Sequence, residues 1–276
     1  MKKIGTIFLF SALSFAVPRV QAQDVTTTTT TTTTVTVTTA PPDLPVYEQP
    51  ECPVDGYLWV PGYWAYDPAN SYYWVPGVWV APPDTGLLWT PAYWGFGDGV
   101  YGFHPGYWST EIGYYGGINY GYGYGGTGFV GGSWSGGNFR YNTAVVNVNS
   151  AVVHNTYVDK TVIVEGNSRS SFNGPGGTLA RPNKDELRVM NEKHIAPTGE
   201  QTAHQRAASE DRNQYASINR GHPAAVAMNK IGGRSVKESP RGAVNAGHVD
   251  NRPTNGLPHI RTTPVATPTE GQDFFS

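Results

Sequence analysis

Aromatic residues recur between residues 57 and 112 at spacings of five and about ten. Four six-residue cassettes read Trp-x-Pro-Gly-x-Trp with small variations, and turn-forming residues lie between them at 67–70, 82–86 and 97–99. The pattern predicts four short strands joined by hairpin loops. The cassette ends are Trp59, Trp64, Trp74, Trp79, Trp89, Trp94, Phe103 and Trp108.

The spacing also predicts a register. One register per hairpin places every cassette aromatic opposite another, which is the stabilising unit of a sheet and is worth up to about 1 kcal/mol a pair. We therefore expect a four-stranded antiparallel meander. Its pairs are Trp59 with Trp79 and Trp64 with Trp74, then Trp74 with Trp94 and Trp79 with Trp89, then Trp94 with Phe103 and Trp89 with Trp108.

Each cassette carries a proline, which lacks a backbone donor and seldom lies inside a strand. In the predicted register proline opposes glycine or alanine, as a kink or bulge shared by neighbouring strands requires. The alternative makes each Pro-Gly a tight turn that packs Trp59 on Trp64. Type II turns fit hairpin twist poorly, however, and Ala92 stands where such a turn needs positive φ. The kink residues are Pro61, Gly62, Pro76, Gly77, Pro91, Ala92, Pro105 and Gly106.

Beyond the repeat, residues 113–140 are rich in glycine and tyrosine. Tyr120, Tyr122 and Tyr124 would share one face of an extended chain, but glycine is costly to order, so a flexible extension is an equal alternative. Residues 141–172 are β-branched with a faint asparagine period. This period predicts short strands or, as a weaker alternative, a small β-solenoid.

Two short helices are predicted within 183–221. Asn183 with Glu186, and Thr198 with Gln201, have capping-box spacing, so the helices should cover about 184–194 and 199–216. Residues 222–276 are rich in proline, glycine and asparagine without periodicity, which predicts a disordered tail. The fold class is therefore mainly β, with a small aromatic meander, two short helices and long disordered regions.

The first 22 residues read as an export signal. Lys2 and Lys3 precede a short apolar run, and Val20-Gln21-Ala22 is a small-residue cleavage site. A threonine- and proline-rich linker is expected over 23–56, followed by the repeat domain over 57–112. No later apolar run reaches transmembrane length. Cys52 lies too far from the signal for a lipoprotein and is either a free thiol or half of an intermolecular disulfide.

Composition and charge narrow the partners. Glycine (34) and proline (22) are abundant in the 276 residues, which limits the size of any core. No lysine or arginine occurs between Asp24 and Phe139. The repeat block should therefore not bind nucleic acid, because phosphate contacts need cationic side chains.

Candidate chemistry is sparse. The histidines lack metal-ligand spacing, and a single cysteine cannot complete a zinc site. Gly-x-Gly-x-x-Gly matches at 121–126 and 123–128 lack the βαβ context of a dinucleotide site. Asp67, Asp84 and Asp98 recur once per repeat but lie in turns, where aspartate is locally favoured. We expect no catalytic residue, no metal, no cofactor and no enzymatic activity.

The aromatic surface is the remaining candidate. Tyrosine and tryptophan are enriched at binding hot spots and can stack on sugar rings, yet they can equally form the core of a small sheet. Both alternatives stay open from the residues alone.

Tyr57-Leu-Trp59-Val-Pro-Gly62-Tyr-Trp64 and Tyr72-Tyr-Trp74-Val-Pro-Gly77-Val-Trp79 resemble the bacterial YXWGXW (WxxGxW) repeat family. The resemblance covers about 57–221 and implies an exported protein of a Gram-negative envelope, in the periplasm or at the outer membrane or cell surface. It implies no particular activity. We expect a non-enzymatic structural or interaction module or, alternatively, a binder of peptidoglycan or exopolysaccharide through exposed rings. The corresponding partners are an envelope glycan or another envelope protein.

Overall fold

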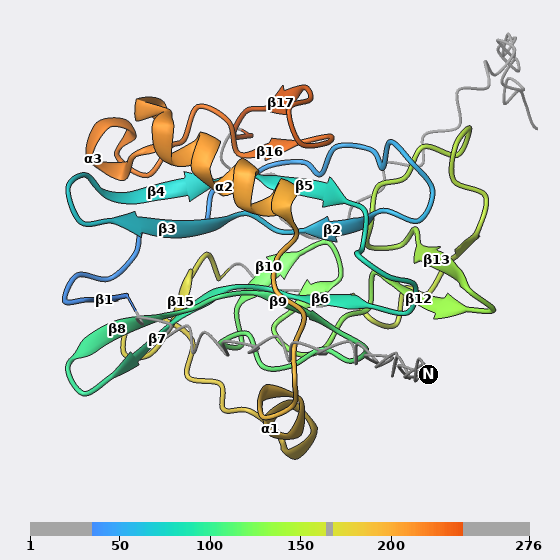
Figure 1. Cartoon of the computed structure of the whole chain (residues 1–276), viewed down its shortest axis with the longest axis horizontal. Helices are drawn as coiled ribbons and strands as arrows, with labels where there is room; N and C mark the ends of the chain where they lie inside the picture. Colours follow the sequence, from blue (N-terminus) through green and yellow to red (C-terminus); the bar gives the residue numbers. More distant parts are fainter. Residues whose placement is uncertain (1–34, 164–167, 240–276) are drawn as a thin grey trace, which may run out of the picture. The chain divides into compact units, whose positions relative to one another are not determined.

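Two long, kinked hairpins form the centre of the fold (Figure 1). The computed structural model describes residues 35–163 and 168–239. The expected export signal, the threonine run at 26–34 and the chain beyond residue 239 lie outside the described residues. The first hairpin contains β2 (Leu58–Val60), β3 (Tyr63–Asp67), β4 (Ser71–Val75) and β5 (Gly77–Val80), and the second contains β6 (Leu88–Thr90), β7 (Tyr93–Gly97), β8 (Val100–His104) and β9 (Tyr107–Ser109).

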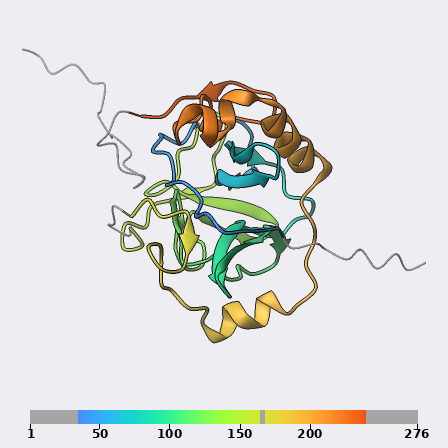
Figure 2. The same ribbon diagram turned by 90° about the vertical axis from the view of Figure 1, so that its left-hand side faces the viewer.

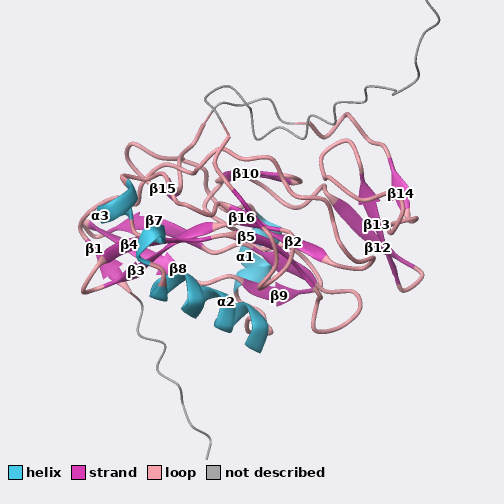
Figure 3. Ribbon diagram, turned by 90° about the horizontal axis from the view of Figure 1, so that it is seen from above, coloured by secondary structure: helices cyan, strands magenta, loops and turns pink. Residues whose placement is uncertain are grey.

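The predicted register is confirmed within each hairpin. In the first, Trp59 opposes Trp79 and Trp64 opposes Trp74. In the second, the pairs are Trp94 with Phe103 and Trp89 with Trp108. The mainly β class is also confirmed: strands of two to five residues, joined by turns and loops, make up most of the elements, and the few short helices lie within residues 184–219 (Figure 3).

The middle pairing of the predicted meander is wrong. No described strand pair joins Trp74 to Trp94 or Trp79 to Trp89. The edge of β5 is instead taken by β16 (Ala227–Met228), and the edge of β7 by β15 (Phe172–Asn173), both parallel. The two hairpins pack against each other. This packing covers the aromatic faces that a single flat sheet would leave exposed.

The Pro-Gly steps are kinks and not turns. Strand pairing stops at Pro61 and Gly62 on one side and at Pro76 on the other, so the interruption is shared across the first hairpin. The chain reverses at the predicted loops 67–70 and 97–99. Asp98 (φ 51°) and Gly99 (φ 81°) both have the positive φ of a type I′ turn. Residues 82–86 connect the two hairpins and do not close a third.

Segments expected to be a linker and a tail supply further strands. β1 (Thr36–Val37) pairs with β8, and β17 (Ser235–Val236) pairs with β16. Leu44, Tyr47 and Val226 are buried. The described parts of 23–56 and 222–276 therefore pack as parts of the fold, which the threonine and proline of the first segment and the proline, glycine and asparagine of the second did not indicate.

The glycine- and tyrosine-rich segment is folded. It forms β10 (Asn119–Gly121), β11 (Tyr124–Gly125) and β12 (Gly132–Ser135), and β12 pairs with β13 (Asn138–Asn142). Tyr120, Tyr122 and Tyr124 are all buried. Tyr122 itself has φ 50°, so these residues form a tight turn and not an extended strand with one tyrosine face.

Asparagine turns dominate residues 141–163. Asn142 is fully buried; its amide donates to the carbonyls of Val130 and Asp159 and accepts from the N–H groups of Ala144 and Asp159. Asn149 accepts similarly from Ala151 N–H. The only strand described in this stretch after β13 is β14 (Thr156–Tyr157), parallel to β13. The asparagine period thus marks side-chain-capped turns, and the predicted short strands are formed only in part, as β14 and, at the end of the predicted 141–172 segment, β15.

Both predicted helix starts are confirmed. α1 (Lys184–Met190) begins at a capping box formed by Asn183 and Glu186, and α2 (Gly199–Glu210) begins at one formed by Thr198 and Gln201. α2 ends earlier than expected because Asp211 leaves the helix and caps the following 3₁₀ turn η1 (Arg212–Gln214), after which α3 (Ala216–Asn219) forms.

Helices cover the outer faces of the two hairpins. Figure 2 shows α2 and α3 beside the first hairpin, with the second hairpin between it and α1. Ala65, Tyr73 and Val75 pack against Ala208 and Tyr215 from the helical segment. No helix among the described residues combines the length and apolar character that a membrane crossing requires.

Candidate functional site

The cassette rings pair across the strands. Trp59–Trp79, Trp64–Trp74 and Trp89–Trp108 are edge-to-face with centroids 5.4, 5.3 and 5.2 Å apart, and Trp94–Phe103 is tilted at 5.1 Å. Edge-to-face contact is the favourable geometry for aromatic pairs. The seven cassette tryptophans are between 0 and 4% exposed. The structure therefore brings the candidate aromatic residues together, and it places them in the hydrophobic core.

The kink glycines make room for these rings. A Cβ on Gly77 would lie 2.6 Å from Cζ2 of Trp59, and one on Gly62 would lie 2.8 Å from Gly77 N and closer still to the Trp74 ring. Gly106 is crowded in the same way by Trp89 and by Thr90 O. The cassette glycines are thus required by the close approach of an indole across the hairpin.

The second hairpin departs from this pattern at two positions that correspond structurally. Phe103 stands where the first hairpin has Trp74, and Ala92 stands where it has Gly62. Because a Cβ on Gly62 would meet the Trp74 ring, we expect the smaller Phe103 ring to leave room for the methyl group of Ala92. The departures at Ala92 and Phe103 are therefore one coupled change.

The indole N–H groups bond to segments distant in sequence. Trp64 donates to Asp43 O (3.1 Å), Trp79 to Pro50 O (2.7 Å) and Trp74 to Val226 O (3.0 Å). Trp94 donates to Trp64 O (2.7 Å) and so joins the two hairpins. Trp108 donates to Gln201 Oε1 (2.8 Å) on α2. The rings thus fix the surrounding chain as well as each other.

Tyrosines from the glycine-rich segment complete the core. The hydroxyls of Tyr120 and Tyr124 donate to Ala92 O (2.6 Å) and Trp89 O (2.7 Å). Burial raises the pKa of both phenols. These hydroxyls serve as structural donors to the backbone of the second hairpin.

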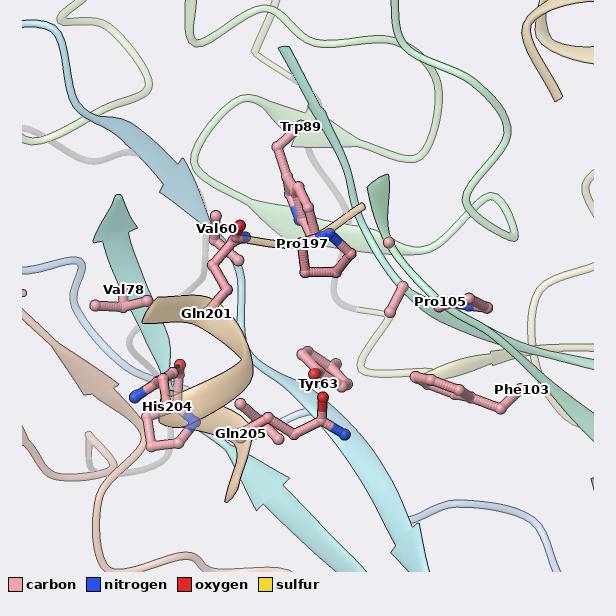
Figure 4. A pocket seen from close by; sticks show the side chains of 14 residues that line it. Val60, Tyr63, Val78, Trp89, Phe103, Pro105, Pro197, Gln201, His204 and Gln205 are labelled. Carbon is pink, nitrogen blue, oxygen red and sulfur yellow. Dashed lines mark hydrogen bonds between the residues drawn. The ribbon is translucent and has the colours of Figure 1, made fainter. Parts of the chain in front are cut away.

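A small cavity of about 50 Å³ lies where the two hairpins meet α2 (Figure 4). Its apolar wall includes Val60, Tyr63, Trp89, Phe103 and Pro105. Gln201, His204 and Gln205 enter from one side of α2. The volume suits a few waters or one small side chain.

The titratable groups near the repeat are held in structural roles. His204 Nε2 lies 2.8 Å from Pro76 O, and burial lowers the pKa of the imidazole. Cys52 is a free, buried thiol whose pKa burial raises to about 11. Asp67 accepts from Ala69 and Asn70 N–H within its turn. In the described part of the chain, no cluster of three or more His, Cys, Asp or Glu could hold a metal ion.

A second, open cleft of about 500 Å³ lies at the end of the molecule that carries β12 and β13. It is lined by Asp55, Asp84 and Trp134, with prolines and the β12–β13 turn completing the wall. Sequence reasoning missed this site. Its one signal was that Trp134 is the tryptophan outside the cassettes.

Comparison with known proteins identifies the repeat. Residues 55–80 match the family described as WXXGXW repeat, in two copies that correspond to the first hairpin. The search of curated proteins gave no match, and neither did the search of solved structures.

Proposed function

We propose that this chain, a WXXGXW-repeat protein, is a non-enzymatic protein of the cell envelope in which the repeats build a rigid scaffold. The burial of all seven cassette tryptophans carries this proposal. Rings that fill the core cannot be a binding face, so the repeat contributes shape and stability, and binding falls to the surfaces it holds in place.

The contacts of the rings support the scaffold role. Each hydrogen-bonded indole named above fixes another segment, from Asp43 before the repeat to Val226 far beyond it. Glycan stacking on the cassette rings themselves would require them to be exposed. That alternative is therefore not favoured at these residues.

Export is proposed from residues 1–22, and fractionation tests it. The full chain with a C-terminal epitope tag should be cleaved near Gln23 and recovered in the periplasm or outer membrane. A variant lacking residues 2–22 should remain in the cytoplasm. Uncleaved full chain in the cytoplasm would contradict the proposal.

Quenching of tryptophan fluorescence tests the scaffold role. In the folded mature chain iodide should quench only a minor part of the emission, because one tryptophan of eight is not buried. In denaturant all of it should become accessible. Substantial quenching that remains after Trp134→Phe would mean that cassette rings are exposed, and it would refute the role.

A further inference from the structure

Trp134 differs from the other seven tryptophans. It is only partly buried, and it lies on β12 opposite Phe139 of β13, with the rings edge-to-face at 5.3 Å. Its indole N–H donates to Leu87 O at 2.9 Å. These two contacts fix the ring, so a partly exposed indole is presented in one orientation.

This ring forms part of the wall of the open cleft. Three separate segments build the cleft: residues 55–56 before β2, residues 82–85 between β5 and β6, and the β12–β13 hairpin. The β5–β6 connection and β12 lie side by side (Figure 1), as the Trp134–Leu87 bond requires. Its volume of about 500 Å³ falls in the range of small-ligand sites, roughly 300–1,000 Å³.

Two carboxylates give the cleft its strongest hydrogen-bond acceptors. Oδ1 of Asp55 accepts from Gly56 N–H (3.0 Å), and Oδ1 of Asp84 accepts from Thr85 N–H (2.8 Å). Within the described residues, Oδ2 of each carboxylate has no hydrogen-bond or ion-pair partner. Asn138 adds an exposed amide, and no lysine or arginine lines the cleft.

We propose that this cleft binds an uncharged pyranose unit of a polysaccharide. The apolar face of the sugar stacks on Trp134, and its hydroxyls donate to Asp55 and Asp84. The two carboxylates repel an anionic sugar, which selects neutral glycans. This site goes beyond the proposed scaffold function, because it assigns a ligand class to one of the surfaces that the scaffold holds.

Calorimetric titration of the purified mature chain tests the proposal. The neutral probes are chitotetraose, cellotetraose and maltotetraose, and the anionic probe is tetragalacturonate. At least one neutral probe should bind saturably and more tightly than the anionic one. If chitotetraose is the best ligand, the natural source is an N-acetylglucosamine polymer. If cellotetraose or maltotetraose is the best ligand, the source is a glucan.

The variants assign the binding to the cleft. Trp134→Ala should weaken binding at least ten-fold, because the stacking of the sugar on the indole ring is lost. Asp84→Asn should weaken it several-fold. Trp134→Phe keeps an aromatic ring against Phe139, so it covers the case in which the alanine variant does not fold. Asp98→Asn is the matched control, an aspartate in a turn outside the cleft, and it should bind as the parent does.

The proposal is overturned by three results: no saturable binding of any neutral probe, tighter binding of tetragalacturonate, or unchanged binding in folded Trp134→Ala or Asp84→Asn. Circular dichroism verifies the fold of each variant. Since the titration uses purified protein, a failure here is distinguishable from a failure of export or of the scaffold role.

Discussion

A Cβ on Gly62 would meet the Trp74 ring in the first hairpin, and Ala92 and Phe103 stand at the corresponding positions of the second. The cassette is therefore a volume rule: a full indole on one strand requires no side chain on the other. Where the ring is a phenyl, a methyl group fits. Two departures from the repeat thus have one physical cause.

A double-mutant cycle tests this coupling. Gly62→Ala alone should destabilise the fold by about 1–3 kcal/mol, because the methyl group overpacks the core against Trp74. Trp74→Phe alone should also destabilise, since it removes volume and the bond to Val226 O. The double variant, which copies the second hairpin, should lose less than the sum of the two by about 1 kcal/mol or more.

Denaturant unfolding measures these differences. Gly97→Ala is the matched control, because a Cβ there meets nothing within 4 Å, and it should change stability by less than about 0.5 kcal/mol. Additive losses of stability in Gly62→Ala and Trp74→Phe would show that the two residues do not compete for the same volume.

One of the side chains that attach α2 to the repeat, Gln201, also caps the helix. Gln201 Oε1 accepts from Thr198 N–H (2.9 Å), which closes the capping box, and from the Trp108 indole (2.8 Å), which links the helix to β9. The start of α2 and a cassette ring therefore depend on the same oxygen.

Removal of that oxygen should cost more than loss of the cap alone. Gln201→Ala should destabilise by about 2–3 kcal/mol, because it also leaves the buried Trp108 N–H without an acceptor. Thr198→Ala, which removes only the cap bond to Gln201 N, should cost about 1 kcal/mol. Equal losses in urea unfolding would mean that the Trp108 bond contributes nothing.

The predictions of strands and helices were confirmed where they depended on residues close together in the sequence. Hairpin registers followed from the spacing of Trp59, Trp64, Trp74 and Trp79, and helix starts followed from capping boxes, since both depend on residues close in sequence. The pairing of β5 with β16 could not be predicted, because it joins residues about 150 positions apart and β16 is only two residues long. The Trp134 cleft was missed for the same reason, as three distant segments form it.

The core of the molecule contains many buried tyrosine side chains. Tyr115, Tyr120, Tyr124 and Tyr141 are nearly or fully buried, and desolvation raises the pKa of each above its ordinary value. All four hydroxyls donate to backbone carbonyls, so the neutral phenol is the form that the fold requires.

Stability should therefore fall at alkaline pH. Below about pH 10 these tyrosines are protonated in both the folded and the unfolded chain. Above it the unfolded chain releases protons that the folded chain retains, so the free energy of unfolding decreases as pH rises. Absorbance at 295 nm should show a fraction of tyrosinate that appears only as near-UV circular dichroism is lost. Complete ionisation near pH 10 with the near-UV signal intact would contradict this.

The parallel contact between β5 and β16 has a consequence for the order of folding. Residues 227–228 cover one edge of β5, and the Trp74 indole bonds to Val226 O, so the first hairpin is completed by some of the last described residues. Such non-local closure slows folding, because loop entropy is lost before the contact forms. A growing or truncated chain keeps that edge open and exposed to other strands, so the first hairpin is completed only after residues 226–228 have been made.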